Sequence, residues 1–144
     1  MRNRKEALKE LQEKIGYQFK DETLLKQALT HSSFANEQKI NKLGNYERLE
    51  FLGDAVLELV SSEFLFNENK DMPEGQLTRL RASMVCEPAL AYCARDISLG
   101  AYILLGKGEE STGGRKRDSI ISDVMEAVIG AIFLDGGIDN AKKY

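Results

Sequence analysis

The chain has 144 residues, a net charge of −3 at pH 7 and an isoelectric point near 5.3. This length predicts one domain that buries roughly two-thirds of the surface its unfolded form exposes. No segment approaches the ~20 apolar residues of a membrane span, and the charged N-terminal segment lacks the apolar stretch of a signal peptide. We therefore expect no membrane insertion and no export.

The acidic balance by itself argues against nucleic-acid binding. The acids, however, are concentrated in two clusters, and divalent cations bound there would reverse the potential that a phosphate group experiences. Basic residues gather in three other groups: Arg2, Arg4 and Lys5; Arg79 and Arg81; and Arg115, Lys116 and Arg117. For each group the sequence leaves open whether it contacts phosphate or is an ordinary solvated surface.

Helical patterns begin near the N-terminus. Leu8, Leu11 and Ile15 recur at helical spacing, and a second apolar pattern over residues 24–29 follows Asp21, which fits an N-cap. The sole histidine, His31, comes next, in the run THSS. A structural role for His31, with hydrogen bonds to nearby backbone, is favoured over that of a triad base.

The middle of the chain continues the helical pattern. Pro73 and Pro88 fit the first position of two further helices. Residues 101–105 resemble a short strand, but without a partner run they are better explained as an extended or helical piece. The glycine-rich residues 106–114 predict a flexible loop and lack the Walker pattern of a phosphate-binding loop. We therefore predict an all-α bundle.

The two cysteines, Cys86 and Cys93, have neither the CxxC spacing nor a Cys/His pattern typical of a metal site. We interpret them as reduced thiols in the core. Reduced cysteines indicate a reducing compartment, so we expect a cytoplasmic protein.

Residues 47–58, ERLEFLGDAVLE, predict an amphipathic helix with an acidic face. Glu47, Glu50 and Asp54 fall within about 60° of one helix face. The apolar residues recur at helical spacing on roughly the opposite arc: Leu49, Leu52, Val56, Leu59 and Val60. Like charges at i,i+4 cost roughly 0.2–0.5 kcal/mol each and Gly53 costs about 1 kcal/mol. A bound cation is the simplest compensation.

A second acidic pair lies in residues 119–135, SIISDVMEAVIGAIFLD. Asp123 and Glu126 are one helical turn apart within an otherwise apolar helix. An unpaired carboxylate in such surroundings costs several kcal/mol, so it usually has a hydrogen-bonded partner or a metal. Carboxylate oxygens without His or Cys favour Mg²⁺ or Mn²⁺, and such ions support phosphodiester hydrolysis in nucleases and phosphatases.

Five segments together resemble the ribonuclease III family in order and approximate spacing. Residues 45–57, NYERLEFLGDAVL, resemble the signature motif of the family. The other four are residues 28–33, 73–81, 105–109 and 119–127. The resemblance covers almost the whole chain and implies the helical bundle of the ribonuclease III endonuclease domain over residues 1–144.

The resemblance implies a role for each acidic position. Glu50, Asp54, Asp123 and Glu126 correspond to the metal-binding carboxylates of the family, with Asp54 and Glu126 as catalytic residues. Their grouping on two helices follows from the residue spacing, but that the two helices face each other is implied by the resemblance alone. Glu47 and Glu74 match two further acids that line the RNA cleft, and a capping or salt-bridge role is the alternative for both.

Phe51 lies between the acidic and apolar arcs of its helix, where an aromatic ring would be partly exposed in a monomer. In ribonuclease III-like proteins the matching aromatic enters a socket on a second subunit. The resemblance therefore implies a homodimer with two metal sites, one for each strand of an A-form duplex. An ordinary core phenylalanine is the alternative.

The function implied is that of a Mg²⁺-dependent endoribonuclease, with Mn²⁺ as a possible substitute. It would hydrolyse double-stranded RNA, including rRNA and mRNA precursors, and leave 5′-phosphate and 3′-hydroxyl ends. One alternative is an all-α nucleoside-triphosphate pyrophosphohydrolase, which also binds Mg²⁺ through acidic helices but is disfavoured by the FLGD continuation. Another is a catalytically silent RNA-binding scaffold, which would be expected to lack at least one of the four carboxylates.

The C-terminal residues predict the end of one helix at Gly136-Gly137 and the start of another, of which only about a turn is present. A domain rarely ends in this way, so we expect the natural chain to continue past Tyr144. Bacterial members of the family usually carry a C-terminal double-stranded-RNA-binding domain, which these 144 residues do not include. With fewer phosphate contacts, RNA binding is expected to be weak and strongly salt-dependent.

Overall fold

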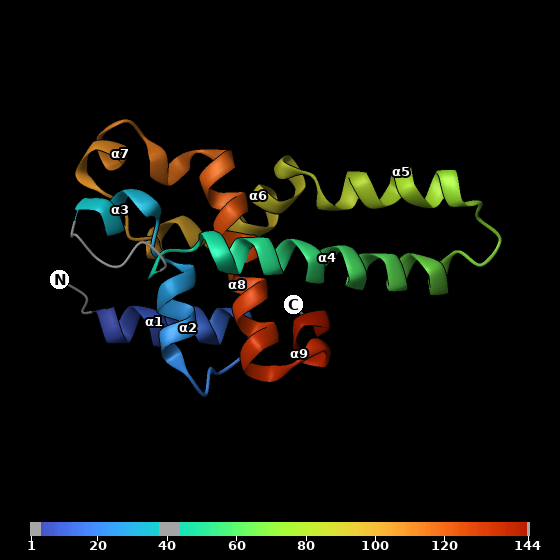
Figure 1. Cartoon of the computed structure of the whole chain (residues 1–144), viewed down its shortest axis with the longest axis horizontal. Helices are drawn as coiled ribbons and strands as arrows, with labels where there is room; N and C mark the ends of the chain where they lie inside the picture. The colour runs from blue at the N-terminus through green and yellow to red at the C-terminus, as the bar shows by residue number, and fades with distance from the viewer. Residues whose placement is uncertain (1–3, 38–43, 144) are drawn as a thin grey trace.

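The computed structural model describes residues 4–37 and 44–143, and over these ranges it contains helices and no strands. The predicted all-α fold is confirmed (Figure 1). The first half of the chain contains α1 (Arg4–Ile15), α2 (Glu22–Ala28), α3 (Ser32–Glu37), α4 (Glu47–Glu68) and α5 (Glu74–Val85). The second half contains α6 (Glu87–Asp96), η2 (Leu99–Tyr102), α7 (Lys107–Ser111), η3 (Gly114–Lys116), α8 (Asp118–Gly136) and α9 (Ile138–Lys143).

Helix α8 is the centre of the fold. Its apolar side chains are buried along most of the helix, and Val124, Val128 and Ile132 are completely inaccessible to solvent. Helices α2, α4, α6 and α9 all pack against it. The apolar residues around Asp123 and Glu126 thus form a buried helix. The two acids can be accommodated only at the part of this helix that packs against a polar surface of another element.

Helices α4 and α8 touch through their backbones at two glycines. A Cβ atom on Gly53 would lie 1.7 Å from the carbonyl oxygen of Glu126, and a Cβ on Gly130 would lie 2.4 Å from the carbonyl oxygen of Leu49. Only glycine permits this approach. The close crossing compensates the helix-propensity cost of Gly53 and sets the acidic face of α4 against the acidic turn of α8.

The outer half of α4 extends away from the other helices and has α5 beside it (Figure 1). None of the described residues of α5 is buried. Apolar side chains are exposed on both helices of this arm, which we define as residues 59–85: Leu59, Phe64, Phe66, Leu80 and Met84. The prediction that Leu59 belongs to the apolar arc of α4 is wrong, because Leu59 is 59% exposed while its neighbour Val60 packs against the core.

Several sequence predictions hold at the level of single residues. Asp21 is the N-cap of α2, and its carboxylate accepts a 3.1 Å hydrogen bond from the backbone N–H of Thr23. Pro73 precedes α5 directly and Pro88 lies in the first turn of α6. Helix α8 ends at Gly136, where Gly137 has a positive φ, and α9 follows as predicted.

Two further sequence predictions are wrong. Cys86 and Cys93 are free thiols, as expected, but both are exposed and not in the core. In α6 the buried positions are taken by Leu90, Ala91 and Ala94, which turns Cys93 outward. The predicted loop over residues 106–114 contains a short helix, α7. At its start the backbone N–H of Lys107 donates a 2.7 Å hydrogen bond to the Glu37 carboxylate.

Residues 101–105 form neither a regular strand nor a continuous helix. After η2 the chain is extended, and Thr30 and Leu104 form an isolated parallel bridge. Among the helices that the structure describes, none has both the length and the apolar character required to cross a membrane.

Candidate metal centre

The crossing of α4 and α8 brings acidic side chains from the two helices together. One carboxylate oxygen each from Glu50, Asp123 and Glu126 lies within 4.8 Å of the others. All three side chains are partly buried. The fourth predicted ligand, Asp54, is exposed, and its side chain is hydrogen-bonded to that of Glu126. The structure thus places all four predicted carboxylates on one surface, with three in a tight group and Asp54 beside it.

The electrostatics of this group favour protonated carboxyls. Burial, followed by the charge of Asp123 and a hydrogen bond with it, raises the pKa of Glu50 to about 7. Burial, followed by a hydrogen bond with Asp54 and its charge, raises the pKa of Glu126 to about 8. Burial also raises the pKa of Asp123, and the nearby charge of Glu87 acts in the same direction. Burial and the charges of the neighbouring acids therefore both disfavour the ionised form of these groups, which a bound cation would favour.

The donor set and its geometry fit a hard divalent cation. Neighbouring oxygens on an octahedral Mg²⁺ ion lie about 3 Å apart and opposite ones about 4 Å apart. Small side-chain rotations would bring the three oxygens, now within 4.8 Å, to that spacing. Glu50, Asp123 and Glu126 are therefore the residues that would hold the ion, with Asp54 close enough to Glu126 to join them or to bind a coordinated water.

Two residues near the centre were not predicted from the sequence. Tyr46 immediately precedes α4, is buried, and forms a side-chain hydrogen bond with Asp123. Glu87, the first residue of α6, is close enough to Asp123 to raise its pKa. The only signal for Tyr46 was its place inside the family motif, and Glu87 gave no signal because its helix carries no other acid of the centre.

The two auxiliary acids lie in different places. Glu47 is one helical turn before Glu50 and contributes to the raised pKa of that residue. Glu74 lies at the start of α5, beside Ser62 and Phe66 in the outer part of the arm. Since α4 rises about 1.5 Å per residue, this part of the arm lies about 18–24 Å along the helix from Glu50. The structure does not bring Glu74 to the carboxylates of its own chain.

His31 has the structural role predicted for it. Its Nδ1 atom accepts a hydrogen bond from the backbone N–H of Ser33 at 3.1 Å and lies 2.8 Å from the Ser33 hydroxyl. Burial lowers the pKa of His31. A neutral imidazole fixed by its own turn is a packing element and not a triad base.

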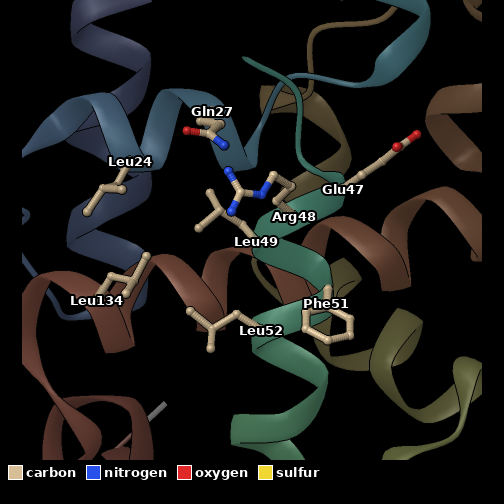
Figure 2. Close-up of a pocket in the computed structure, with 8 residues that line it drawn as sticks. All are labelled: Leu24, Gln27, Glu47, Arg48, Leu49, Phe51, Leu52 and Leu134. Atoms are coloured by element: carbon tan, nitrogen blue, oxygen red, sulfur yellow. The ribbon is translucent and has the colours of Figure 1, made fainter. Parts of the chain in front are cut away.

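Phe51 is 82% exposed and lies beside an apolar hollow on the surface. The hollow is lined by Leu24, Gln27, Glu47, Arg48, Leu49, Phe51, Leu52 and Leu134. In Figure 2 the leucines come from α2, α4 and α8, and Glu47 points away from them. The alternative of a core phenylalanine is wrong, because none of the residues that the structure describes covers the ring.

Three of the seven described basic residues in the basic groups of the sequence make internal side-chain contacts: Arg81, Arg115 and Arg117. Arg115 pairs with Glu110 and donates to the carbonyls of Gly100 and Ile103 at 2.7 and 2.8 Å. Arg117 lies 2.9 Å from Glu109. Arg81 donates to the Ser62 hydroxyl at 2.9 Å and lies 3.6 Å from Glu58. Arg79, Lys5 and Lys116 are exposed, and Arg2 lies outside the described residues.

Comparison with known proteins decides the family. A family model described as ribonuclease-III-like matches residues 21–144. This chain belongs to the ribonuclease-III-like family. It is 57% identical over 133 residues to Ribonuclease 3 of Caldanaerobacter subterraneus subsp. tengcongensis, an alignment that covers 92% of this chain and 58% of that protein. Ribonuclease 3 of Listeria monocytogenes is 55% identical over 130 residues, covering 90% of this chain and 57% of the relative. The chain thus spans less than two-thirds of these relatives.

Solved structures agree with the family and with the fold. A nuclease domain of ribonuclease III from Campylobacter jejuni, described for flexibility in a region involved in dimer formation, has a TM-score of 0.88 and 46% identity. That match covers 94% of this chain and 91% of the solved one. Dicer from Pichia stipitis has a TM-score of 0.61 and 26% identity, covering 85% of this chain and 49% of that chain. The helical bundle is therefore that of a ribonuclease III nuclease domain.

Proposed function

We propose that this chain is a Mg²⁺-dependent endoribonuclease that hydrolyses phosphodiester bonds of double-stranded RNA. The observation that carries the proposal is the convergence of Glu50, Asp123 and Glu126 oxygens within 4.8 Å in a chain of this family. The relatives named Ribonuclease 3 support the reaction class. All four carboxylates expected of an active member are present, which argues against a silent scaffold.

The chemistry follows from the carboxylates. Divalent ions at such a centre activate water and stabilise the departing oxygen of a phosphodiester. Glu50, Asp123 and Glu126 would hold the ion, and Asp54 would orient Glu126 through their hydrogen bond. We expect hydrolysis to leave 5′-phosphate and 3′-hydroxyl ends, with Mn²⁺ able to replace Mg²⁺ at the same oxygen ligands.

We also propose that two copies associate around the hollow beside Phe51. A phenyl ring that is 82% exposed, next to a hollow lined by Leu24, Leu52 and Leu134, is complementary to the same surface on a second copy. A two-fold axis would then bury both rings reciprocally. The dimer would carry two acidic centres, one for each strand of the duplex.

The proposal is tested by cleavage of an end-labelled RNA duplex by the unsubstituted protein and by Glu126→Gln. The substitution keeps the size of the side chain but removes the charge that would bind the ion. We expect cleavage only when Mg²⁺ or Mn²⁺ is added, and a loss of more than about 100-fold in the variant, since even residues that merely support a metal ligand cost about 10–100-fold. Circular dichroism and melting temperature check that the variant is folded.

Glu68→Gln is the matched control, because it makes the same change at an exposed position in the last turn of α4. It should cleave at the unsubstituted rate. Cleavage of duplex RNA by Glu126→Gln at the full rate would contradict the assignment of the site. Hydrolysis of free nucleoside triphosphates, with no attack on the duplex, would support the pyrophosphohydrolase alternative instead.

A further inference from the structure

Tyr46 lies between the acidic centre and the turn that contains His31. Its side chain is 7% exposed, and its phenolic O–H donates a hydrogen bond to the Asp123 carboxylate. The residue lies outside α4, just before Glu47, so the helical pattern of the acids does not include it.

The Tyr46 ring is held from several sides. It lies parallel to the imidazole of His31, with ring centroids 5.4 Å apart and an interplanar angle of 16°. The Tyr46 backbone N–H donates to the carbonyl of Thr30 at 2.9 Å, and its own carbonyl accepts from the N–H of Glu50 at 2.9 Å. The hydroxyl is therefore fixed relative to both α4 and the turn that contains His31.

That turn is fixed in its own right. The Ser33 hydroxyl, 2.8 Å from His31 Nδ1, accepts a 2.9 Å hydrogen bond from the backbone N–H of Gly106. The backbone N–H of His31 donates to the carbonyl of Leu104 at 3.0 Å. These contacts join the segment around residue 31 to the segment before α7, so the imidazole is a rigid support for the tyrosine ring.

A neutral donor suits an acidic metal centre. A lysine or arginine at this place would bind Asp123, but its positive charge would repel a divalent cation and lower the affinity of the centre for that cation. A phenol can fix one carboxylate oxygen without adding charge, which leaves the second oxygen free to face the ion. Residues that hydrogen-bond a metal ligand in this way typically contribute 10–100-fold to metal affinity or activity.

We propose that Tyr46, supported by His31, is a positioning residue that holds the Asp123 carboxylate in the orientation that binds the divalent ion. This inference rests on the proposed function, since it assumes an ion at the centre. It assigns Tyr46 no contact with RNA and no proton transfer.

The experiment measures Mn²⁺ binding without RNA, by calorimetry, for the unsubstituted protein and for Tyr46→Phe. Phenylalanine keeps the ring and its contact with His31 and removes only the hydroxyl. We expect Mn²⁺ to bind at least about 10-fold more weakly. In cleavage assays, the Mg²⁺ concentration for half-maximal rate should rise by a similar factor, while the rate at saturating Mg²⁺ stays within a few-fold of normal.

Tyr17→Phe is the matched control. The Tyr17 hydroxyl donates to Asp135 at 2.6 Å, and Asp135 lies on α8 twelve residues after Asp123, or about 18 Å along the helix. The same hydroxyl is thus removed from another tyrosine–aspartate pair of the same helix. Its Mn²⁺ affinity should stay within about twofold of the unsubstituted value. An equal loss of affinity in both variants would indicate a general structural effect and overturn the proposal.

A double-mutant cycle tests the route of the effect. If Tyr46 acts through Asp123, then Tyr46→Phe should not weaken Mn²⁺ binding further in an Asp123→Asn background. Additive losses would contradict that route. Should Tyr46→Phe fail to fold, ¹³C-tyrosine NMR of the unsubstituted protein gives the answer. The Tyr46 ring signal should shift on Mg²⁺ addition and the Tyr17 signal should not; an unmoved Tyr46 signal would overturn the inference.

The two proposals fail in different ways. If the unsubstituted protein binds no Mn²⁺ and cleaves no duplex, the proposed function is wrong. If it binds Mn²⁺ and Tyr46→Phe binds it equally well, only the role of Tyr46 is wrong.

Discussion

The two halves of α4 lie in different surroundings, although they belong to one continuous helix. The inner half crosses α8 at Gly53 and Gly130, where a single added methyl group would overlap backbone atoms. The outer half has α5 along it and exposes apolar side chains such as Phe66, which is 71% exposed. The acids of the candidate centre lie in the inner half. Rigid backbone contact is found where carboxylates must converge, and it is absent where the helix only forms an arm.

Glycine-to-alanine substitutions should show the largest difference in stability between the crossing of α4 with α8 and the arm that the outer half of α4 forms with α5. In Gly53→Ala the new Cβ would lie 1.7 Å from the Glu126 carbonyl oxygen, so α4 and α8 must move apart. We expect a loss of more than about 3 kcal/mol in the free energy of unfolding, because overpacking against backbone cannot be relieved by side-chain rotation. Urea denaturation measures this loss. Mn²⁺ binding should be lost with it, since the carboxylates of the two helices separate.

Gly75→Ala is the control in the arm. Gly75 lies in the first turn of α5, and a Cβ there meets nothing within 4 Å. Because alanine has the higher helix propensity, this variant should be unchanged or more stable by up to about 1 kcal/mol. Equal destabilisation by both substitutions would show that the crossing is no tighter than the arm.

Removal of the Phe51 ring tests whether an exposed aromatic ring beside the hollow contributes more to dimer formation than an exposed aromatic ring elsewhere on the surface. Phe51→Ala should raise the dissociation constant of the proposed dimer by at least about 100-fold, since two phenyl rings would each lose roughly 1.5–3 kcal/mol of burial. Sedimentation velocity at several concentrations measures it. Tyr92, which is 77% exposed on α6, provides the control. If Tyr92→Ala weakens association as much as Phe51→Ala, the hollow is not the interface.

The raised pKa values of the crossing predict a smaller effect, on the pH dependence of stability. The pKa of Glu50 rises from 4.5 to about 7 and that of Glu126 from 4.5 to about 8 on folding. Between these limits the folded protein binds more protons than the unfolded chain, so stability falls as pH rises. The melting temperature of metal-free protein should therefore decrease from pH 5 to pH 8.

Mg²⁺ should reverse this trend, because it replaces the lost protons, and the melting temperature should rise most at pH 8. Glu126→Gln should flatten the decrease in the metal-free protein. If the melting temperature of the metal-free protein stays constant or rises over this range, folding does not raise the pKa values of Glu50 and Glu126.

The sequence predicted the helices well because each carries its own periodic signal. The expected helix over residues 119–135 is Asp118–Gly136 in the structure, and the acidic run begins α4 at Glu47 as expected. The acids of each helix could be grouped from spacing alone. Their convergence could not, because it depends on the approach of Gly53 to Gly130, and in the sequence Gly53 is only a residue with poor helix propensity.

Features that depend on tertiary packing were missed or wrongly placed. Cys93 was expected in the core, yet Leu90 and Ala94 take the buried face of α6. Residues 106–114 contain helix α7, which is stabilised by a carboxylate from Glu37, far away in the sequence. Tyr46 lies outside any helical period and contacts Asp123 only after α8 has packed. That the converged acids bind a metal stays a prediction.

Anomalous diffraction from crystals soaked in Mn²⁺ tests the central claim most directly, since it locates the ion without depending on activity. We predict a peak within about 2.5 Å of oxygens from Glu50, Asp123 and Glu126, and its absence in crystals of Glu126→Gln. Crystals soaked at a concentration that supports RNA cleavage, but with no Mn²⁺ between α4 and α8, would contradict the account.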